Sequence, residues 1–195
     1  MLRHICVAAA FCATVSGPAG AQGSGPAASR DSPPFGALID SVEAGEIVLR
    51  DVCLPGILNR RPIEELALYE RLVAMPSRAA GAGADDKVWR LGSLSPVYAV
   101  AWADGSCSTY VDRGPSEKLR AMAAATILAR PEGFAMTQTG LVDAGRVERT
   151  VYCAWNGEER LVATITTPAN AKARTRALSS TVYRARGPSS LCPAR

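Results

Sequence analysis

Hydrophobic residues near the start of the chain recur at helical spacing. From Phe35 to Val42 they lie on one helix face, which predicts a helix that reaches Cys53. Residues 62–76 predict a second helix, because the proline at its start suits the first helical turn and the proline at its end cannot continue the helix. The two helices would form a helical lead-in over residues 35–76, and a polar loop of small residues follows them.

Beyond this loop the pattern changes to strands followed by a helix. Three short apolar runs come first, and the turn signal Asp104-Gly105 precedes the third run. An amphipathic helix follows Pro115, and its inner positions recur at i, i+3, i+4, i+7 and i+8 from Leu119. The predicted strands are residues 88–94, 97–102 and 107–111, and the whole unit covers residues 87–130.

The same order of landmarks recurs further along the chain. A strand-rich stretch begins at Gly133, and a second helix is predicted after Pro168 with Ala177, Leu178, Thr181 and Val182 on its inner face. Four landmarks keep their register: the spacing is 54 residues for Tyr98 and Tyr152, 53 for Trp102 and Trp155, 52 for Gly105 and Gly157, and 53 for Pro115 and Pro168.

These patterns predict an α+β fold of two N-terminal helices followed by two β-β-β-α repeats, residues 87–130 and 131–186. The repeats would form a six-stranded antiparallel sheet with helices on one face, leaving the other face open to a partner. Chance similarity between two hairpin-and-helix segments is the alternative to a true repeat.

The N-terminal residues predict export. A short positive start precedes an apolar run at residues 5–15, and Ala19-Gly20-Ala21 offers the small residues that a signal peptidase reads. The apolar run is shorter than the roughly 20 residues that a membrane-spanning helix needs. We therefore predict a signal peptide over residues 1–21, a linker over residues 22–34, one domain over residues 35–195, and a periplasmic or secreted location without a transmembrane segment.

Cysteine usage agrees with an oxidising compartment. Cys53, Cys107, Cys153 and Cys192 remain after signal cleavage, and their wide spacing is typical of structural disulfides, not of metal or redox motifs. Three pairings of these four cysteines are possible. Pairing in chain order would place one bridge in each half, each worth about 4 kcal/mol in the chain-entropy model.

The signal peptide also contains the only histidine, His4. A mature chain without histidine cannot use a Ser-His-Asp or Cys-His mechanism or a histidine metal site. We therefore assign no catalytic, cofactor-binding or metal-binding residue. A histidine-free hydrolase remains an alternative, with carboxylates drawn from Asp104, Asp112, Glu158 and Glu159.

The end of the chain is strongly basic. Residues 160–195 contain seven Lys or Arg residues and no acidic residue. This region could contact an anionic surface. A solvated helix face is the simpler interpretation, and nucleic acid is not an expected partner.

Aromatic residues gather on the predicted hairpins. Large aromatics beside arginine are typical of binding hot spots, but they are also ordinary core residues of a half-buried sheet. The candidate binding surface consists of Tyr98, Trp102, Tyr110, Tyr152 and Trp155.

Residues 89–110 contain Val97-Tyr98, Trp102 and the run Asp104-Gly105-Ser106-Cys107-Ser108. In these features the chain resembles small exported proteobacterial proteins of unknown function, and this resemblance implies no activity. The tandem layout is also similar to secreted enzyme inhibitors built from two α/β repeats. We therefore predict a periplasmic binding or interaction protein, potentially inhibitor-like, whose partner is a protein or another component of the cell envelope.

Overall fold

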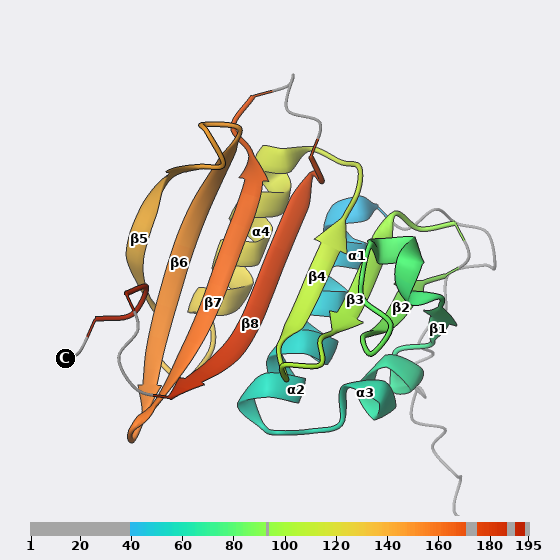
Figure 1. Cartoon of the computed structure of the whole chain (residues 1–195), viewed down its shortest axis with the longest axis horizontal. Coiled ribbons are helices and arrows are strands. Elements are labelled where there is room, and N and C mark those ends of the chain that lie inside the picture. The colour runs from blue at the N-terminus through green and yellow to red at the C-terminus, as the bar shows by residue number, and fades with distance from the viewer. Residues whose placement is uncertain (1–39, 93, 171–174, 187–189, 194–195) are drawn as a thin grey trace, which may run out of the picture. The chain divides into compact units, whose positions relative to one another are not determined.

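An eight-stranded antiparallel sheet organises the part of the chain that the computed structural model describes, residues 40–92, 94–170, 175–186 and 190–193. The predicted signal peptide, its cleavage site and the linker lie outside these residues. The strand order is β1-β2-β3-β4-β8-β7-β6-β5, so two four-stranded meanders meet where β4 pairs with β8 (Figure 1). The strands are β1 (Leu72–Met75), β2 (Lys87–Leu91), β3 (Val97–Ala101), β4 (Cys107–Val111), β5 (Ala135–Val142), β6 (Val147–Asn156), β7 (Glu159–Pro168) and β8 (Leu178–Arg186).

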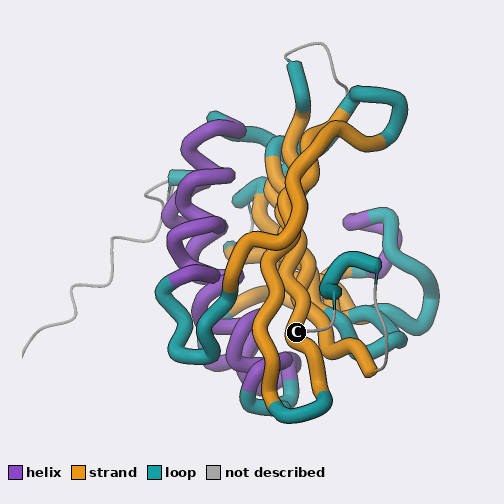
Figure 2. Tube along the Cα trace, turned by 90° about the vertical axis from the view of Figure 1, so that its left-hand side faces the viewer, coloured by secondary structure: helices purple, strands orange, loops and turns teal. Residues whose placement is uncertain are grey.

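One face of the sheet, here the inner face, is covered by helices (Figure 2). A continuous helical run comprises α1 (Ser41–Ile47), η1 (Val48–Cys53) and α2 (Leu54–Leu58). The π-helical segment η1 precedes Pro55, which has no N–H for the bond to the fourth residue before it. The remaining helices are α3 (Ile63–Tyr69), α4 (Ser116–Leu128) and a short 3₁₀ helix, η2 (Ser77–Ala80).

The main core lies between the inner face and the helices α1, η1 and α4. Helix α4 buries Leu119, Met122, Ala123 and Ile127, as its predicted amphipathic pattern requires. One disulfide joins the two layers, because Cys53 of η1 is bonded to Cys107 of β4 with 5.3 Å between their Cα atoms. Of the three possible pairings, the structure therefore contains the one in chain order.

The predicted α+β class is confirmed, but the predicted β-β-β-α repeats are not. The sheet has eight strands instead of six, and α4 precedes the second meander instead of closing a repeat. Tyr98 and Tyr152, which define one repeat landmark, point to opposite faces of the sheet.

One predicted helix is shorter than expected and another is absent, each for an identifiable reason. The helix predicted over residues 62–76 ends at Tyr69, because Arg71 adopts a left-handed φ of 58° and residues 72–75 pair with β2 as β1. The helix predicted after Pro168 is replaced by β8. Leu178, Ser180 and Val182 are buried at every second position there, and this period of two marks a strand.

Candidate binding site on the outer face of the sheet

The cross-strand register places most of the predicted aromatic surface on the outer face, opposite the helices. Tyr98 and Tyr110 pair across β3 and β4 on this face. Trp102 and Trp155 pack against outer-face residues as well. Tyr152 is the exception, because it is buried in the main core, where burial raises its pKa. The sequence prediction is therefore wrong for Tyr152 as a surface residue.

The outer face is not fully open, because residues 77–86 lie across β2 and β3. Ala80 of this segment packs on Val88 and Val100, and Trp102 and Tyr110 adjoin the same cluster. Asp86 fixes the fold of the segment by accepting hydrogen bonds from the N–H groups of Gly83 (2.7 Å) and Ala103 (2.9 Å). We refer to residues 77–86 as the 77–86 segment.

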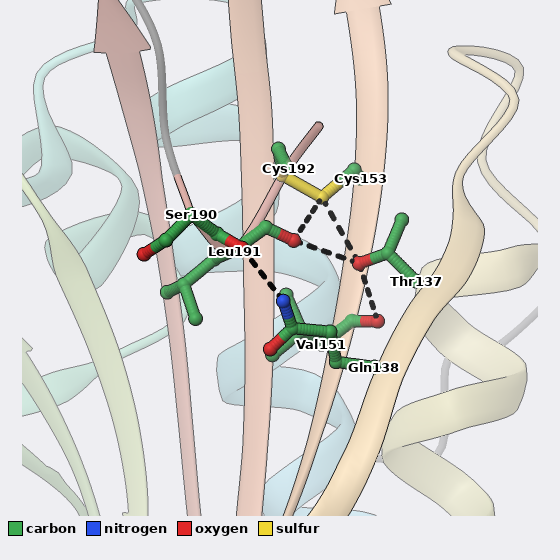
Figure 3. The surroundings of a disulfide bond; sticks show 7 residues. All are labelled: Thr137, Gln138, Val151, Cys153, Ser190, Leu191 and Cys192. Atoms are coloured by element: carbon green, nitrogen blue, oxygen red, sulfur yellow. Dashed lines mark hydrogen bonds between the residues drawn. A yellow bond between two sulfur atoms is a disulfide. The ribbon is translucent and has the colours of Figure 1, made fainter. Parts of the chain in front are cut away.

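A second segment, residues 190–193, lies over the other side of the outer face. Cys192 is bonded to Cys153 of β6, with 5.9 Å between their Cα atoms (Figure 3). Thr137 Oγ1 donates a hydrogen bond to the carbonyl of Leu191 (3.0 Å), and Gln138 Nε2 donates one to the carbonyl of Ser190 (2.7 Å). We refer to residues 190–193 as the terminal segment. It encloses a small apolar cluster with Val151, Val162, Trp155 and Tyr183.

The two segments change the predicted binding surface. Tyr98, Trp102, Tyr110 and Trp155 are half-buried on the outer face, and none of them is exposed. Trp102 Nε1 donates to Ser108 Oγ (2.7 Å), and its ring meets Tyr110 edge to face with centroids 6.2 Å apart. These aromatics form secondary cores under the two segments, so they do not present an open aromatic patch.

Hydroxyl side chains occupy the centre of the outer face, on β4, β8 and β7. Ser108 Oγ and Thr181 Oγ1 lie 2.7 Å apart in a hydrogen bond across β4 and β8. A cavity of about 290 Å³ continues this row at the end of the sheet near residue 175. Its lining includes Tyr110, Asp143, Val147, Thr166, Arg176 and Ser179. We call this space the outer-face cavity.

Arg176 organises one wall of the outer-face cavity. Its guanidinium carbon lies 3.7 Å from the centroid of the Tyr110 ring. Its Nε donates to Asp112 Oδ1 (3.1 Å), and its Nη2 donates to the carbonyl of Ala80 (2.6 Å). One side chain therefore connects the start of β8 to the end of β4 and to the 77–86 segment.

The strand residues of the outer face carry charge of one sign, although Asp143 in the cavity lining and Asp112 beside it are each paired with an arginine. The outward-facing residues of the described strands include Arg90, Arg149 and Arg160 and no Asp or Glu. Arg149 pairs with Thr166, which lines the outer-face cavity. Burial raises the pKa of Tyr183 on β8, and the charge of Arg149 acts on that pKa in the opposite direction.

Three of the four carboxylates considered for a hydrolase are bound by other groups of the protein, and the fourth, Glu158, is exposed in the turn between β6 and β7. Asp104 accepts hydrogen bonds from the backbone N–H and the hydroxyl of Ser106 at one end of β4, whereas Asp112 binds Arg176 at the other end. Glu159 contacts Arg60 and Arg184, and the hydrogen bond from Arg60 is the main cause of its lowered pKa. A lowered pKa keeps this carboxyl group ionised and does not suit a general acid.

The predicted basic region does not form a solvated helix face. Its described members are Arg160, Arg176, Arg184 and Arg186, and three of these lie in strands β7 and β8. Arg184 is half-buried and donates to the carbonyls of Ile57 (2.8 Å) and Leu58 (2.7 Å) at the end of α2. Lys172, Arg174 and Arg195 lie outside the described residues.

Sequence reasoning found Tyr110 of the outer-face cavity but missed its other lining residues. Thr166 and Ser179 belong to strands whose alternating hydroxyl residues could have indicated a polar sheet face. Arg176 was visible only as one member of the basic region. Its role depends on the pairing of β8 with β4, two strands that are far apart in sequence.

The described part of the chain contains neither a metal-binding cluster of side chains nor a membrane-spanning helix. No group of three or more His, Cys, Asp or Glu side chains there could hold a metal ion. None of the helices described has the length and hydropathy needed to cross a membrane.

Comparisons with protein-family models, with curated proteins and with solved structures found no match to this chain. Function is therefore inferred from its own contacts, charges and cavities.

Proposed function

We propose that this protein is an exported binding protein that recognises an acidic segment of a partner protein at the outer face of its sheet. An inhibitor acts in this way when the bound segment belongs to the partner's functional surface. The observation that carries the proposal is the charge of that face, where the outward strand residues include Arg90, Arg149 and Arg160 and no carboxylate. Complementary charge of this kind increases association rates and partner selectivity.

The size of the outer-face cavity favours a side chain of a larger partner over a free small molecule. Pockets that enclose a drug-sized ligand usually measure about 300–1,000 Å³. At about 290 Å³ the outer-face cavity falls just below that range, and it suits one or two side chains. The hydroxyl groups of Thr166 and Ser179 in its lining are suited to donate hydrogen bonds to a carboxylate. Asp143 in the same lining is paired with Arg146, which offsets its negative charge.

The walls of this site are held in place before any partner binds. Arg176 joins the 77–86 segment to the sheet, and the Cys153–Cys192 disulfide holds the terminal segment. A rigid surface loses little conformational entropy when it binds, which improves affinity. The two disulfides and the predicted signal peptide support a periplasmic or secreted location for this interaction.

The experiment uses the chain without its predicted signal peptide, residues 22–195, immobilised and exposed to periplasmic extract. Arg149→Glu reverses a charge beside the outer-face cavity. Lys118→Glu makes the same change of charge on the exposed side of α4 and serves as the matched control. We expect a partner that the wild type and Lys118→Glu retain, that Arg149→Glu retains at least about tenfold less, and that salt elutes.

Equal retention by all three proteins would contradict the proposal. A partner lost only from Lys118→Glu would place the interface on the helix layer instead. Circular dichroism of each variant confirms that the fold is intact before retention is compared.

A further inference from the structure

A second cavity lies beside the connection between α2 and α3, away from the outer-face cavity. It measures about 340 Å³, and three arginines line it: Arg60, Arg61 and Arg184. The other lining residues are glycine, isoleucine and proline, so no acidic side chain belongs to its wall. We call this space the arginine cavity.

A carboxylate already binds to two of these arginines. Arg60 Nη2 donates to both oxygens of Glu159, at 2.8 Å and 3.0 Å. Arg184 Nη1 contacts the same carboxylate, and Arg186 Nη2 lies 3.9 Å from it. Arg60 and Arg184 are therefore arranged to hold an oxyanion.

Positive charge remains in excess after this pairing. Arg60, Arg61, Arg184 and Arg186 carry four positive charges, and Glu159 supplies one negative charge. For the lining alone, Arg60, Arg61 and Arg184 together with the bound Glu159 leave a surplus of two positive charges. A cation is therefore disfavoured in this cavity, and an anion with two negative charges would balance it.

The donors that could hold such an anion are well placed. Arg184 is fixed, because its Nε and Nη2 donate to the carbonyls of Ile57 and Leu58. Arg60 has a left-handed φ of 54°, a conformation that a non-glycine residue keeps only where its surroundings hold it. Its contact with Glu159 uses Nη2, so Nε and Nη1 are not needed for that contact.

We propose that the arginine cavity binds a tetrahedral oxyanion of the phosphate or sulfate class, with Arg61 and Arg60 as its principal donors. Arg61 is exposed at the cavity, and within the described residues it makes no ion pair. The planar fork of a guanidinium group matches phosphate and sulfate oxygens with two parallel hydrogen bonds. The volume accommodates the anion together with part of an attached group, so both free phosphate and a phosphate ester fit.

Isothermal titration calorimetry of residues 22–195 with inorganic phosphate and with sulfate tests the proposal, at an ionic strength held constant with sodium chloride. Arg61→Gln removes the charge of Arg61 and keeps a side chain of similar length. Arg78→Gln makes the same change at an exposed arginine of η2 and is the control. We expect saturable binding to the wild type and to Arg78→Gln, and about tenfold weaker binding to Arg61→Gln.

Two results would overturn the proposal: no binding of phosphate or sulfate above the chloride background, or equal binding by Arg61→Gln and the wild type. Glycerol 3-phosphate distinguishes the two sources of the anion. Tighter binding than that of inorganic phosphate supports the site with an ester as its ligand, whereas equal binding supports it with the free ion. Arg149→Glu should keep wild-type phosphate affinity, so this test and that of the outer-face interaction can fail separately.

Discussion

The guanidinium group of Arg176 lies over the ring of Tyr110, with 3.7 Å between its Cζ atom and the ring centroid. The same side chain binds Asp112 and the carbonyl of Ala80. The stacking and the two hydrogen bonds connect three parts of the chain that are distant in sequence. Arg176 is therefore expected to stabilise the fold as well as to shape the outer-face cavity.

Replacement of Arg176 by alanine tests this role. We expect Arg176→Ala to lower the free energy of unfolding by about 2 kcal/mol, because it removes a cation–π contact and leaves the carbonyl of Ala80 without this donor. Urea denaturation measures the change. Arg113→Ala, at an exposed arginine after β4, is the control and should change stability by less than about 0.5 kcal/mol. Similar losses in both variants would show that the contacts of Arg176 contribute little.

The Cys153–Cys192 disulfide should stabilise a local structure. Replacing both cysteines with serine releases the terminal segment, whose remaining described contacts include the hydrogen bonds from Thr137 and Gln138. We expect faster amide hydrogen exchange in β6 near Val151 and β7 near Val162, because the apolar cluster beneath the terminal segment becomes accessible to water. Exchange in α4 should rise less than exchange beneath the terminal segment, because α4 is exposed only through the overall loss of stability that opening this 39-residue loop causes.

The Cys53–Cys107 disulfide provides the comparison, since it lies in the main core between η1 and β4. Its removal should affect the whole fold and lower the free energy of unfolding by about 4 kcal/mol, the chain-entropy value for a loop closed over 54 residues. Equal acceleration of exchange in α4 and beneath the terminal segment after loss of the Cys153–Cys192 pair would contradict this assignment.

The local patterns of the sequence predicted several elements correctly, namely the α+β class, the helix α4, and the strands around the Asp104-Gly105 turn. These elements depend on spacing within one segment, such as the inner positions of α4 from Leu119 to Ile127. The strand β8 was missed because Ala177, Leu178, Thr181 and Val182 fit helical spacing, whereas the strand alternation is carried by Leu178, Ser180 and Val182 and places a serine at an inward position. Only its pairing with β4 and β7 decides between the two.

The binding surface was predictable only in part. The face of the sheet to which a side chain points depends on the strand register, and whether that side chain is covered depends on segments that are distant in sequence. Tyr98 and Tyr152 stand at equivalent points of the apparent repeat but lie on opposite faces. A sequence pattern could not show that residues 77–86 and 190–193 return over the outer face. The arginine cavity was hidden for the same reason, since Arg60 and Arg184 are brought together by the tertiary fold.

Gly45 of α1 packs closely against side chains of α4 and β4. A Cβ atom at this position would lie 3.1 Å from Met122 Cε and 3.3 Å from Val111 Cγ2. Alanine normally favours a helix over glycine by about 1 kcal/mol, but overpacking a core costs about 1–3 kcal/mol. We therefore expect Gly45→Ala to lower the free energy of unfolding by about 1 kcal/mol.

Met122→Ala provides the matching test, because it removes the methyl group nearest to the added Cβ. In a double-mutant cycle, Gly45→Ala should cost less in the Met122→Ala background than in the wild type. An identical cost in both backgrounds would show that contact with Met122 does not limit the residue at position 45.

The contact between Arg60 and Glu159 should make stability depend on pH. In the folded protein the pKa of Glu159 lies below its usual value of 4.5, and the hydrogen bond from Arg60 is the main cause. A carboxyl group with a lowered folded-state pKa stabilises the protein above its unfolded-state pKa, and this stabilisation disappears as the pH falls through the folded-state pKa. Glu159→Gln should therefore be less stable than the wild type at pH 7, and the difference should shrink as the pH falls below 4.5. Glu158→Gln, at the exposed neighbouring position, should follow the wild type throughout. Urea denaturation from pH 7 down to about pH 3 measures all three proteins, and a difference for Glu159→Gln that stays constant with pH would refute the assigned role of its charge.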